Sequence, residues 1–348
     1  MSPVPQAILQ ALNLHTDSTT CALDSSGLSS GFTNTGALHV KIAHENGTQA
    51  EHKYFIKTSQ NGSAAAEMFH GEYESLNAIA QIVPGFCPRA LAWGPLDKKN
   101  GYFLATEFLD LGGSVDRGSG DETNHSRLAY RLGELHSTPA PVDAQTGRRR
   151  YGFPVPTFCG DTRQSNTFYD SWAEFYARER LLTILASSEK RNGRDEGLRE
   201  LVERTAHTVV PRLLGNDHLG YNSRGEGEGI QPVVVHGDLW SGNTDRGSIV
   251  GNGREEAVGD VVYDPSACYA HSEFELGIMH MFGGFGARFF NEYHLLVPKT
   301  EPVEEYDDRV LLYELYHHLN HHAIFGGGYR SGAMSIMQKL LRKYSDMR

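Results

Sequence analysis

The sequence has few cysteines, no long apolar run and little clustering of positive charge. Its four cysteines are scattered through 348 residues without a C-x-x-C pair, which argues against a zinc knuckle or a redox dithiol. No stretch approaches the roughly 18 consecutive apolar residues of a membrane-spanning helix, and the N-terminus lacks the basic residues of a signal peptide. We therefore expect a cytoplasmic protein that does not associate with membranes.

The charge balance also narrows the possible partners. The formal net charge is −11, so the surface as a whole would repel nucleic-acid phosphates. The one dense basic run, Arg148–Arg150, has no second cluster or interleaved aromatic residues around it. We interpret this run as a solvated loop and expect no nucleic-acid partner. A hydrophobic content of 39% is instead ordinary for a globular enzyme or binding protein.

The hydrophobic period changes along the chain and predicts an α+β protein. Residues 25–43, 52–59 and 101–113 have the alternation and turn residues of strands, and residues 64–82 have helical spacing up to Pro84. Beyond the glycine break at 112–113 the pattern is mostly helical, with Leu128, Leu132 and Leu135 on one face. We therefore predict an N-terminal nucleotide-binding lobe at 1–109 and a C-terminal catalytic and substrate-binding lobe at 110–348.

The segment VVVHGDLWSGN (Val233–Asn243) is an apolar run that ends in polar groups. Its valines predict a buried strand, and Gly237 permits a sharp turn directly after it. Asp238 and Asn243 have the D-x-x-x-x-N spacing of a protein-kinase catalytic loop. In phosphoryl transfer such an aspartate accepts the proton of the attacking hydroxyl, and the amide oxygen helps to hold Mg²⁺. Asp238 is thus the predicted base and Asn243 a predicted metal ligand.

A second metal-binding carboxylate is expected on the next strand, in AVGDVVYDP. Asp264 follows the apolar pair Val261–Val262, whereas Asp260 precedes it. Because site residues are expected where a strand ends, we favour Asp264 over Asp260.

The first third of the chain contains the residues that a bound nucleotide would need. A kinase small lobe uses a strand lysine to hold the α- and β-phosphates and a helix glutamate to orient that lysine. Lys57 ends the strand YFIK, and Glu72 or Glu74 lies on the helix that follows. The strand LATEFLD would meet adenine through the backbone groups of Glu107, Phe108 and Leu109.

Four separated segments resemble the fructosamine-kinase (ketosamine 3-kinase) family, a relative of aminoglycoside and choline kinases. These segments are HGDLWSGN, DPSACYAHSEFELGIMHMFGGF, MFHGEYESL and LYHHLNHHAIFGGGY. The resemblance covers nearly the whole chain. It implies a two-lobed protein-kinase-like fold, with a small antiparallel-sheet N-lobe and a larger, mostly helical C-lobe.

The resemblance also assigns roles to individual residues. It makes Asp238 the base, Lys57 the phosphate lysine, and Asn243 and Asp264 the metal ligands, and it selects Glu72 over Glu74. ATP and Mg²⁺ are the implied cofactors. The implied acceptor is the C3 hydroxyl of a ketosamine such as fructosyl- or ribulosyl-lysine, free or on a protein. The phosphorylated adduct would then release its amine, which makes the implied function deglycation.

The substrate itself suggests three further site residues. A ketosamine combines several hydroxyls with a protonated amine, so its site should offer an aromatic face, hydrogen-bonding groups and negative charge. Trp240 follows the predicted base closely and could supply the face. His271 and Glu273 lie in AHSEFEL, a segment that must approach Asp238 if Asp238 and Asp264 share one metal-nucleotide site.

Two other classes of protein would share part of this pattern. A small-molecule kinase of the aminoglycoside or choline kinase type would also carry Asp238, Asn243 and Asp264. A cationic aminoglycoside, however, needs several carboxylates around its pocket, and few occur near these motifs. A non-catalytic kinase-like binding module would be expected to lack one of Lys57, Asp238, Asn243 and Asp264, and all four are present.

Overall fold

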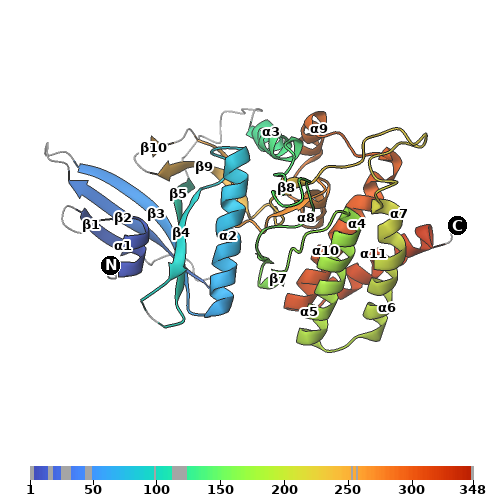
Figure 1. The fold of residues 1–348 in the computed structure, drawn as a ribbon, viewed down its shortest axis with the longest axis horizontal. Coiled ribbons are helices and arrows are strands. Elements are labelled where there is room, and N and C mark those ends of the chain that lie inside the picture. Colours follow the sequence, from blue (N-terminus) through green and yellow to red (C-terminus); the bar gives the residue numbers. More distant parts are fainter. Residues whose placement is uncertain are drawn as a thin grey trace. The chain divides into compact units, whose positions relative to one another are not determined.

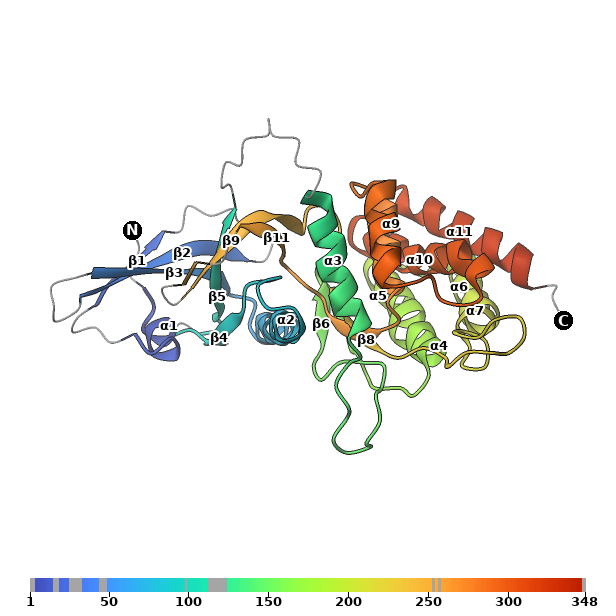
Figure 2. The same cartoon turned by 90° about the horizontal axis from the view of Figure 1, so that it is seen from above.

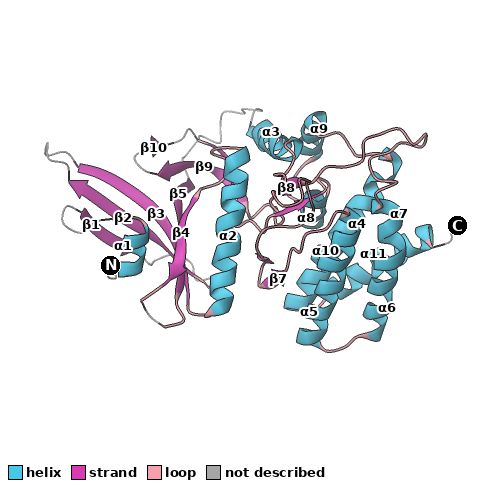
Figure 3. Cartoon of the chain, viewed as in Figure 1, coloured by secondary structure: helices cyan, strands magenta, loops and turns pink. Residues whose placement is uncertain are grey.

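The computed structural model describes residues 4–14, 19–24, 33–43, 49–97, 99–111, 124–251, 254–255 and 258–345. Residues 25–32 of the first predicted strand, and 112–113 of the last, lie outside them. The chain divides into two compact units. Strands predominate in the first unit and helices in the second (Figure 3). The first unit comprises Met1–Leu128 and Asn243–Pro265, and the second comprises Ala129–Gly242 and Ser266–Arg348.

The first unit is built on an eight-stranded antiparallel sheet. The strands follow the order β1-β2-β3-β5-β9-β10, with β4 paired to β5 (Figure 1). Strand β11 pairs with β9. The strands are β1 (Thr19–Asp24), β2 (Asn34–Ala43), β3 (Gln49–Ser59), β4 (Ala90–Pro95), β5 (Tyr102–Leu111), β9 (Thr244–Gly251), β10 (Arg254–Glu255) and β11 (Gly259–Val262).

Two helices pack against this sheet. Helix α2 (Ser63–Ile82) lies along β4 and β5 and buries Phe69, Leu76 and Ile79, which share one helical face. It ends just before Pro84, as the sequence predicts. The short helix α1 (Gln6–Ala11) contributes Ile8 to the sheet core. That core also contains Leu38, Val40, Tyr54, Ile56, Phe103 and Ala105.

The chain returns to the first unit after the VVVHGDLWSGN segment. The β9–β11 hairpin extends the N-terminal sheet, because β9 pairs with the end of β5, Phe108 opposite Val250 and Leu109 opposite Ile249. This differs from the predicted division at 109/110, which assigns residues 243–265 to the C-terminal lobe. The β9–β11 hairpin covers a strand edge that would otherwise leave backbone groups unpaired.

The second unit is mostly helical, with two short two-stranded sheets. Helix α10 (Tyr306–Phe325) packs against α5 (Thr183–Asn192), α8 (Phe274–Phe282) and α11 (Tyr329–Tyr344). Figure 2 shows α10 beside α5 and α11. The sheets pair β8 (Val233–Val235) with β12 (Cys268–Ala270) and β6 (Thr157–Cys159) with β7 (Thr162–Gln164). The other elements are α3 (Asn124–Ser137), which begins in the first unit, α4 (Trp172–Phe175), α6 (Glu196–Arg204), α7 (Val210–Leu214), α9 (Ala287–Leu296), the π-helical segments Tyr176–Leu182 and Thr205–Val209, and the 3₁₀ turn Val303–Glu305.

Aromatic side chains form the centre of the second unit. Trp172, Tyr176, Phe274 and Tyr313 are fully buried, with ring centroids 5.3–6.0 Å apart. Trp172 Nε1 donates a hydrogen bond to Tyr313 Oη at 2.8 Å, so its buried N–H is satisfied. None of the helices in the described part of the chain is both long and apolar enough to cross a bilayer.

Candidate active site

In the first unit, the Lys57 ammonium lies between two carboxylates. Lys57 lies near the end of β3, and its Nζ is 2.6 Å from Glu72 Oε1 of α2 and 2.6 Å from Asp264 Oδ1. Burial alone would lower the pKa of Lys57, but the Asp264 and Glu72 carboxylates outweigh it and the pKa is raised. Lys57 therefore remains cationic, as binding of phosphate requires. Glu74 points elsewhere, with its Oε1 3.5 Å from His70 Nε2.

A cavity of about 240 Å³ in the first unit opens onto this charged group. Its lining joins the charged Lys57, Glu72 and Asp264 to apolar side chains and to the polar Thr33, Thr35, Thr106 and Glu107. A nucleotide likewise combines charged phosphates with a flat base. The apolar lining includes Phe55, Leu76, Leu109 and Tyr263.

The strand predicted to meet adenine contributes unevenly to this cavity. Glu107 and Leu109 line it, whereas Phe108 is not among its lining residues. The Glu107 carboxylate is held by the backbone N–H of Arg89 at 2.9 Å and by its Nη2 at 2.7 Å. The Glu107 side chain is thus occupied within the protein, and adenine contact through the backbone of Glu107, Phe108 and Leu109 stays a prediction.

The β9–β11 hairpin brings the two predicted metal ligands to the same end of the sheet. Its last pair is Thr244 opposite Val262, and the next backbone bond runs from Tyr263 N–H to Asn243 O at 3.1 Å. Asn243 and Asp264 flank this end, and their amide and carboxylate oxygens are ligand types that fit Mg²⁺. Asp260 instead lies within β11 and is buried.

The backbone of Asp264 is strained. Its φ of 56° lies in the left-handed region, which few residues other than glycine adopt. Such strain is costly and concentrates at functional positions. The side chain held in this way is about half exposed, so it is open to a ligand as well as to Lys57.

In the second unit, a buried carboxylate organises the loop that follows β8. Glu275 of α8 accepts the backbone N–H of His236 at 2.5 Å and that of Gly237 at 3.0 Å. Burial alone would raise the pKa of Glu275, but His136, His236 and these hydrogen bonds outweigh it and the pKa is lowered. The ionised carboxylate therefore accepts hydrogen bonds from two consecutive backbone N–H groups directly after β8.

Gly237 is required at the turn itself. Its φ is 81°, and a Cβ at this position would lie 2.1 Å from the carbonyl oxygen of Ser266. Only glycine allows this close approach. The turn delivers Asp238, half-buried, with its backbone N–H 3.3 Å from His236 Nδ1 and one carboxylate oxygen 3.7 Å from Cys159 Sγ.

Trp240 lies in the same loop and is accessible. The backbone N–H of Trp240 donates to the carbonyl oxygen of Asp238 at 3.1 Å, and the residue is 39% exposed. The indole packs 5.8 Å from the ring of Phe282, itself 39% exposed. The indole could therefore stack on a bound sugar or amine, as the sequence suggests.

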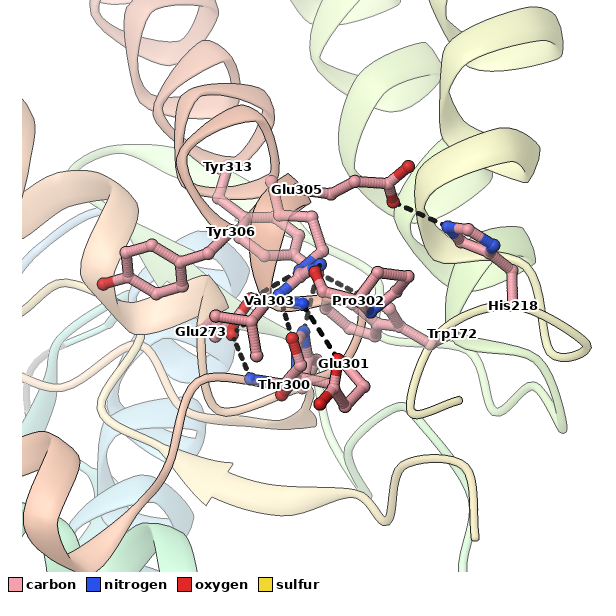
Figure 4. A network of polar contacts seen from close by, with 12 residues as sticks. Trp172, His218, Glu273, Thr300, Glu301, Pro302, Val303, Glu305, Tyr306 and Tyr313 are labelled. Atoms are coloured by element: carbon pink, nitrogen blue, oxygen red, sulfur yellow. Dashed lines mark hydrogen bonds and ion pairs between the residues drawn. The ribbon is translucent and has the colours of Figure 1, made fainter. Parts of the chain in front are cut away.

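His271 and Glu273, the other two predicted substrate residues, are each only 2% exposed. His271 bonds Tyr313 Oη and Thr300 Oγ1, both at 2.8 Å. Glu273 forms two bonds with Arg309, at 2.7 and 3.1 Å, and accepts the Thr300 N–H at 2.8 Å (Figure 4). All their polar atoms are directed into this internal network, so neither side chain is available to a substrate as the structure has it.

Comparison with known proteins identifies the family. The family model described as fructosamine kinase matches residues 6–343. The chain belongs to the fructosamine kinase family. It is 33% identical over 299 residues to a ketosamine-3-kinase of Mus musculus, covering 83% of this chain and 88% of that protein. It is 34% identical over 289 residues to a chloroplastic protein-ribulosamine 3-kinase of Arabidopsis thaliana, covering 83% and 76%.

Solved structures support the same fold. A protein from Thermobifida fusca, assigned as a fructosamine-3-kinase, matches with a TM-score of 0.69 at 23% identity, covering 98% of this chain and all of the other. An aminoglycoside phosphotransferase in complex with AMP-PNP and hygromycin B matches with a TM-score of 0.50 at 14% identity, covering 98% and 100%. The predicted family and two-lobed kinase-like fold are confirmed.

Two residues that contact the loop after β8 directly, Glu275 and Cys159, are not predicted from the sequence. Glu275 has a local signal, because a carboxylate inside the apolar helix FELGIMHMF must find a buried partner. Cys159 has none, because only the tertiary fold brings it to Asp238.

The Lys57 arrangement predicts graded effects on nucleotide use. Lys57→Met should lower kcat/KM for ATP by about 10²-fold, because phosphate positioning is lost. Glu72→Gln should lower it by roughly tenfold, since it loosens the lysine indirectly. Steady-state phosphoryl-transfer kinetics measure both. Glu74→Gln is the matched control on the same helix and should stay near wild type; equal damage from Glu72→Gln and Glu74→Gln would contradict the assignment.

Buried His271 predicts a pH-dependent stability. Burial, opposed by Glu273, lowers its pKa from 6.5 to about 4. Between these pH values the unfolded chain binds a proton that the folded chain excludes. As the pH is lowered from 6.5 to about 4, this residue therefore decreases the free energy of unfolding by about 3 kcal/mol. Urea unfolding at about pH 7 and about pH 4.5 should show the stability advantage of wild type over His271→Gln shrinking as pH falls.

The exposed His207 supplies the matched control for this experiment. His207→Gln makes the same chemical change at an exposed position, and equal effects of His207→Gln and His271→Gln would contradict the assignment. Parallel pH curves for wild type and His271→Gln would show that His271 is not the titrating group.

Proposed function

We propose that this protein transfers the γ-phosphoryl group of ATP to the C3 hydroxyl of ketosamines, in particular fructosyl- or ribulosyl-lysine adducts. The observation that carries the proposal is Lys57 held between Glu72 and Asp264, in a chain of the fructosamine kinase family. A lysine oriented in this way is suited to nucleotide phosphates. Relatives over most of the chain are named for ketosamine and ribulosamine phosphorylation.

Each site residue has a defined task in this reaction. Asp238 accepts the proton of the C3 hydroxyl. At the same time the hydroxyl oxygen forms a bond to Pγ, and the bond from Pγ to the ADP oxygen breaks. Lys57 orients the α- and β-phosphates. Asn243 and Asp264 would hold Mg²⁺, which neutralises phosphate charge when bound. The predicted base thus lies on the second unit, and the proposed nucleotide and metal ligands on the first.

The product chemistry gives the proposed reaction its purpose. A 3-phosphorylated ketosamine is unstable and releases its amine, so phosphorylation reverses glycation of a lysine. The substrates are free adducts or glycated proteins. The cytoplasmic location expected from the sequence is part of this proposal.

The role of Asp238 predicts a defect in chemistry rather than in nucleotide binding. A positioned base contributes about 10²- to 10⁴-fold, so Asp238→Asn should lower kcat by that order and leave KM for ATP nearly unchanged. Coupled ADP-release assays with fructosyl-lysine measure both constants. Asp217→Asn makes the same chemical change at an exposed position and should behave as wild type. An Asp238→Asn enzyme within a few-fold of wild-type kcat would remove Asp238 from the mechanism.

The substrate assignment predicts a preference and a contact. Fructosyl- and ribulosyl-lysine should be phosphorylated and kanamycin-like amines should not. Trp240→Ala should raise KM for the ketosamine by roughly tenfold and leave KM for ATP unchanged, because an aromatic stacking partner is lost. Tyr130→Ala removes another exposed aromatic ring and should change neither constant. A higher kcat/KM for an aminoglycoside or choline than for any ketosamine would overturn the assignment.

A further inference from the structure

The β6–β7 hairpin of the second unit places a buried thiol against Asp238. Cys159, the last residue of β6, is 1% exposed, and its Sγ lies 3.7 Å from Asp238 Oδ1. A thiol is a weak hydrogen-bond donor and an ionised carboxylate a strong acceptor. The contact joins residues far apart in the sequence, and both belong to the same unit.

A second polar residue fixes the direction of this hydrogen bond. Asn320 of α10, also 1% exposed, donates from Nδ2 to Cys159 Sγ at 3.3 Å and to the Cys159 carbonyl oxygen at 3.2 Å. Because the sulfur accepts from Asn320, its own hydrogen is left to point to Asp238. Successive donors polarise one another, so the Asn320 amide strengthens the S–H group as a donor.

The hairpin that carries Cys159 is itself tied to the segment beside the loop. Gln164 of β7 accepts from Thr157 Oγ1 at 2.9 Å and from Ser266 Oγ at 2.9 Å, and its Nε2 donates to Tyr316 Oη at 2.6 Å. The Ser266 N–H in turn donates to the carbonyl oxygen of His236 at 2.8 Å. The sulfur is therefore held at a set distance from the loop by a closed network.

The charged and titratable groups that face the thiol keep it protonated. Burial, followed by the negative charge of Asp238, raises the pKa of Cys159 far above its usual range, and Arg180 and Asn320 oppose this only in part. Tyr316 of α10 also faces it, with its own pKa raised by burial and by Cys159. A thiol in this environment is neither a nucleophile nor a metal ligand, but a permanent donor.

We propose that Cys159 is a positioning residue for Asp238. The S–H group of Cys159 fixes one carboxylate oxygen of Asp238 and favours the ionised form of this base. This inference rests on the proposed function, since it requires Asp238 to act as the base. The relay from Asn320 through Cys159 to Asp238 then links the orientation of the base to helix α10.

The test compares Cys159→Ala with Cys159→Ser over a range of pH, using fructosyl-lysine as acceptor. Loss of one modest hydrogen bond should lower kcat by about two- to tenfold in Cys159→Ala. It should also move the acid limb of the kcat/KM profile to higher pH, because a donor to the charged form holds the pKa of a carboxyl group down. Cys159→Ser keeps a donor and should retain most of kcat and the wild-type limb. KM for ATP should be unchanged in both variants.

Two further variants separate positioning from packing. Cys268→Ala removes another buried thiol of the same unit and should lower the melting temperature without moving the acid limb. Asn320→Ala should move the limb in the same direction as Cys159→Ala. The double variant should show less than the sum of the two effects, because both act through one relay.

An acid limb of Cys159→Ala equal to that of wild type would overturn the proposal, and so would equal profiles for the alanine and serine variants. If Cys159→Ala fails to fold, the serine and Asn320→Ala profiles decide, and an unmoved limb in Asn320→Ala then counts against the relay. A wild-type enzyme that phosphorylates some other hydroxyl acceptor contradicts the proposed function instead, and the same series with that acceptor tests Cys159.

Discussion

The loop that carries the predicted base depends on one buried carboxylate, Glu275. Taking an ionised carboxylate out of water costs several kcal/mol unless its oxygens are bonded. The N–H groups of His236 and Gly237 supply those bonds, and as buried backbone groups they need acceptors themselves. The carboxylate and the two N–H groups therefore satisfy each other's need for a hydrogen-bond partner. The sharp turn at Gly237, and hence the position of Asp238, follows from this exchange.

The parts of the site that local pattern determines could be predicted from the sequence. Lys57 at the end of an alternating strand and Glu72 on the next helix are separated by a short connection, so strand and helix periods suffice to bring them to the same region. The spacing of Asp238 and Asn243 alone predicts their roles as base and metal ligand, and both roles stay predictions. Asp264 was preferred to Asp260 because of its place after the strand, and the structure has it in contact with Lys57.

Other features required the tertiary fold. Pairing of β9 with the end of β5 joins segments with a large separation in sequence, and periodicity does not reveal which distant strand covers an edge. His271 and Glu273 lie just before α8, where no helical period fixes the direction of a side chain. The sequence identified the right segment, but it is Glu275 that reaches the loop, while Glu273 turns to Arg309.

The left-handed backbone at Asp264 has a consequence for how this protein can diverge. Glycine adopts such a conformation freely, and among the other residues asparagine and aspartate adopt it at the lowest cost. Substitutions that keep this backbone conformation are therefore to asparagine or glycine, and both remove the carboxylate that contacts Lys57. In a descendant that keeps the fold but no longer needs the proposed activity, either residue at position 264 would mark that loss in its sequence.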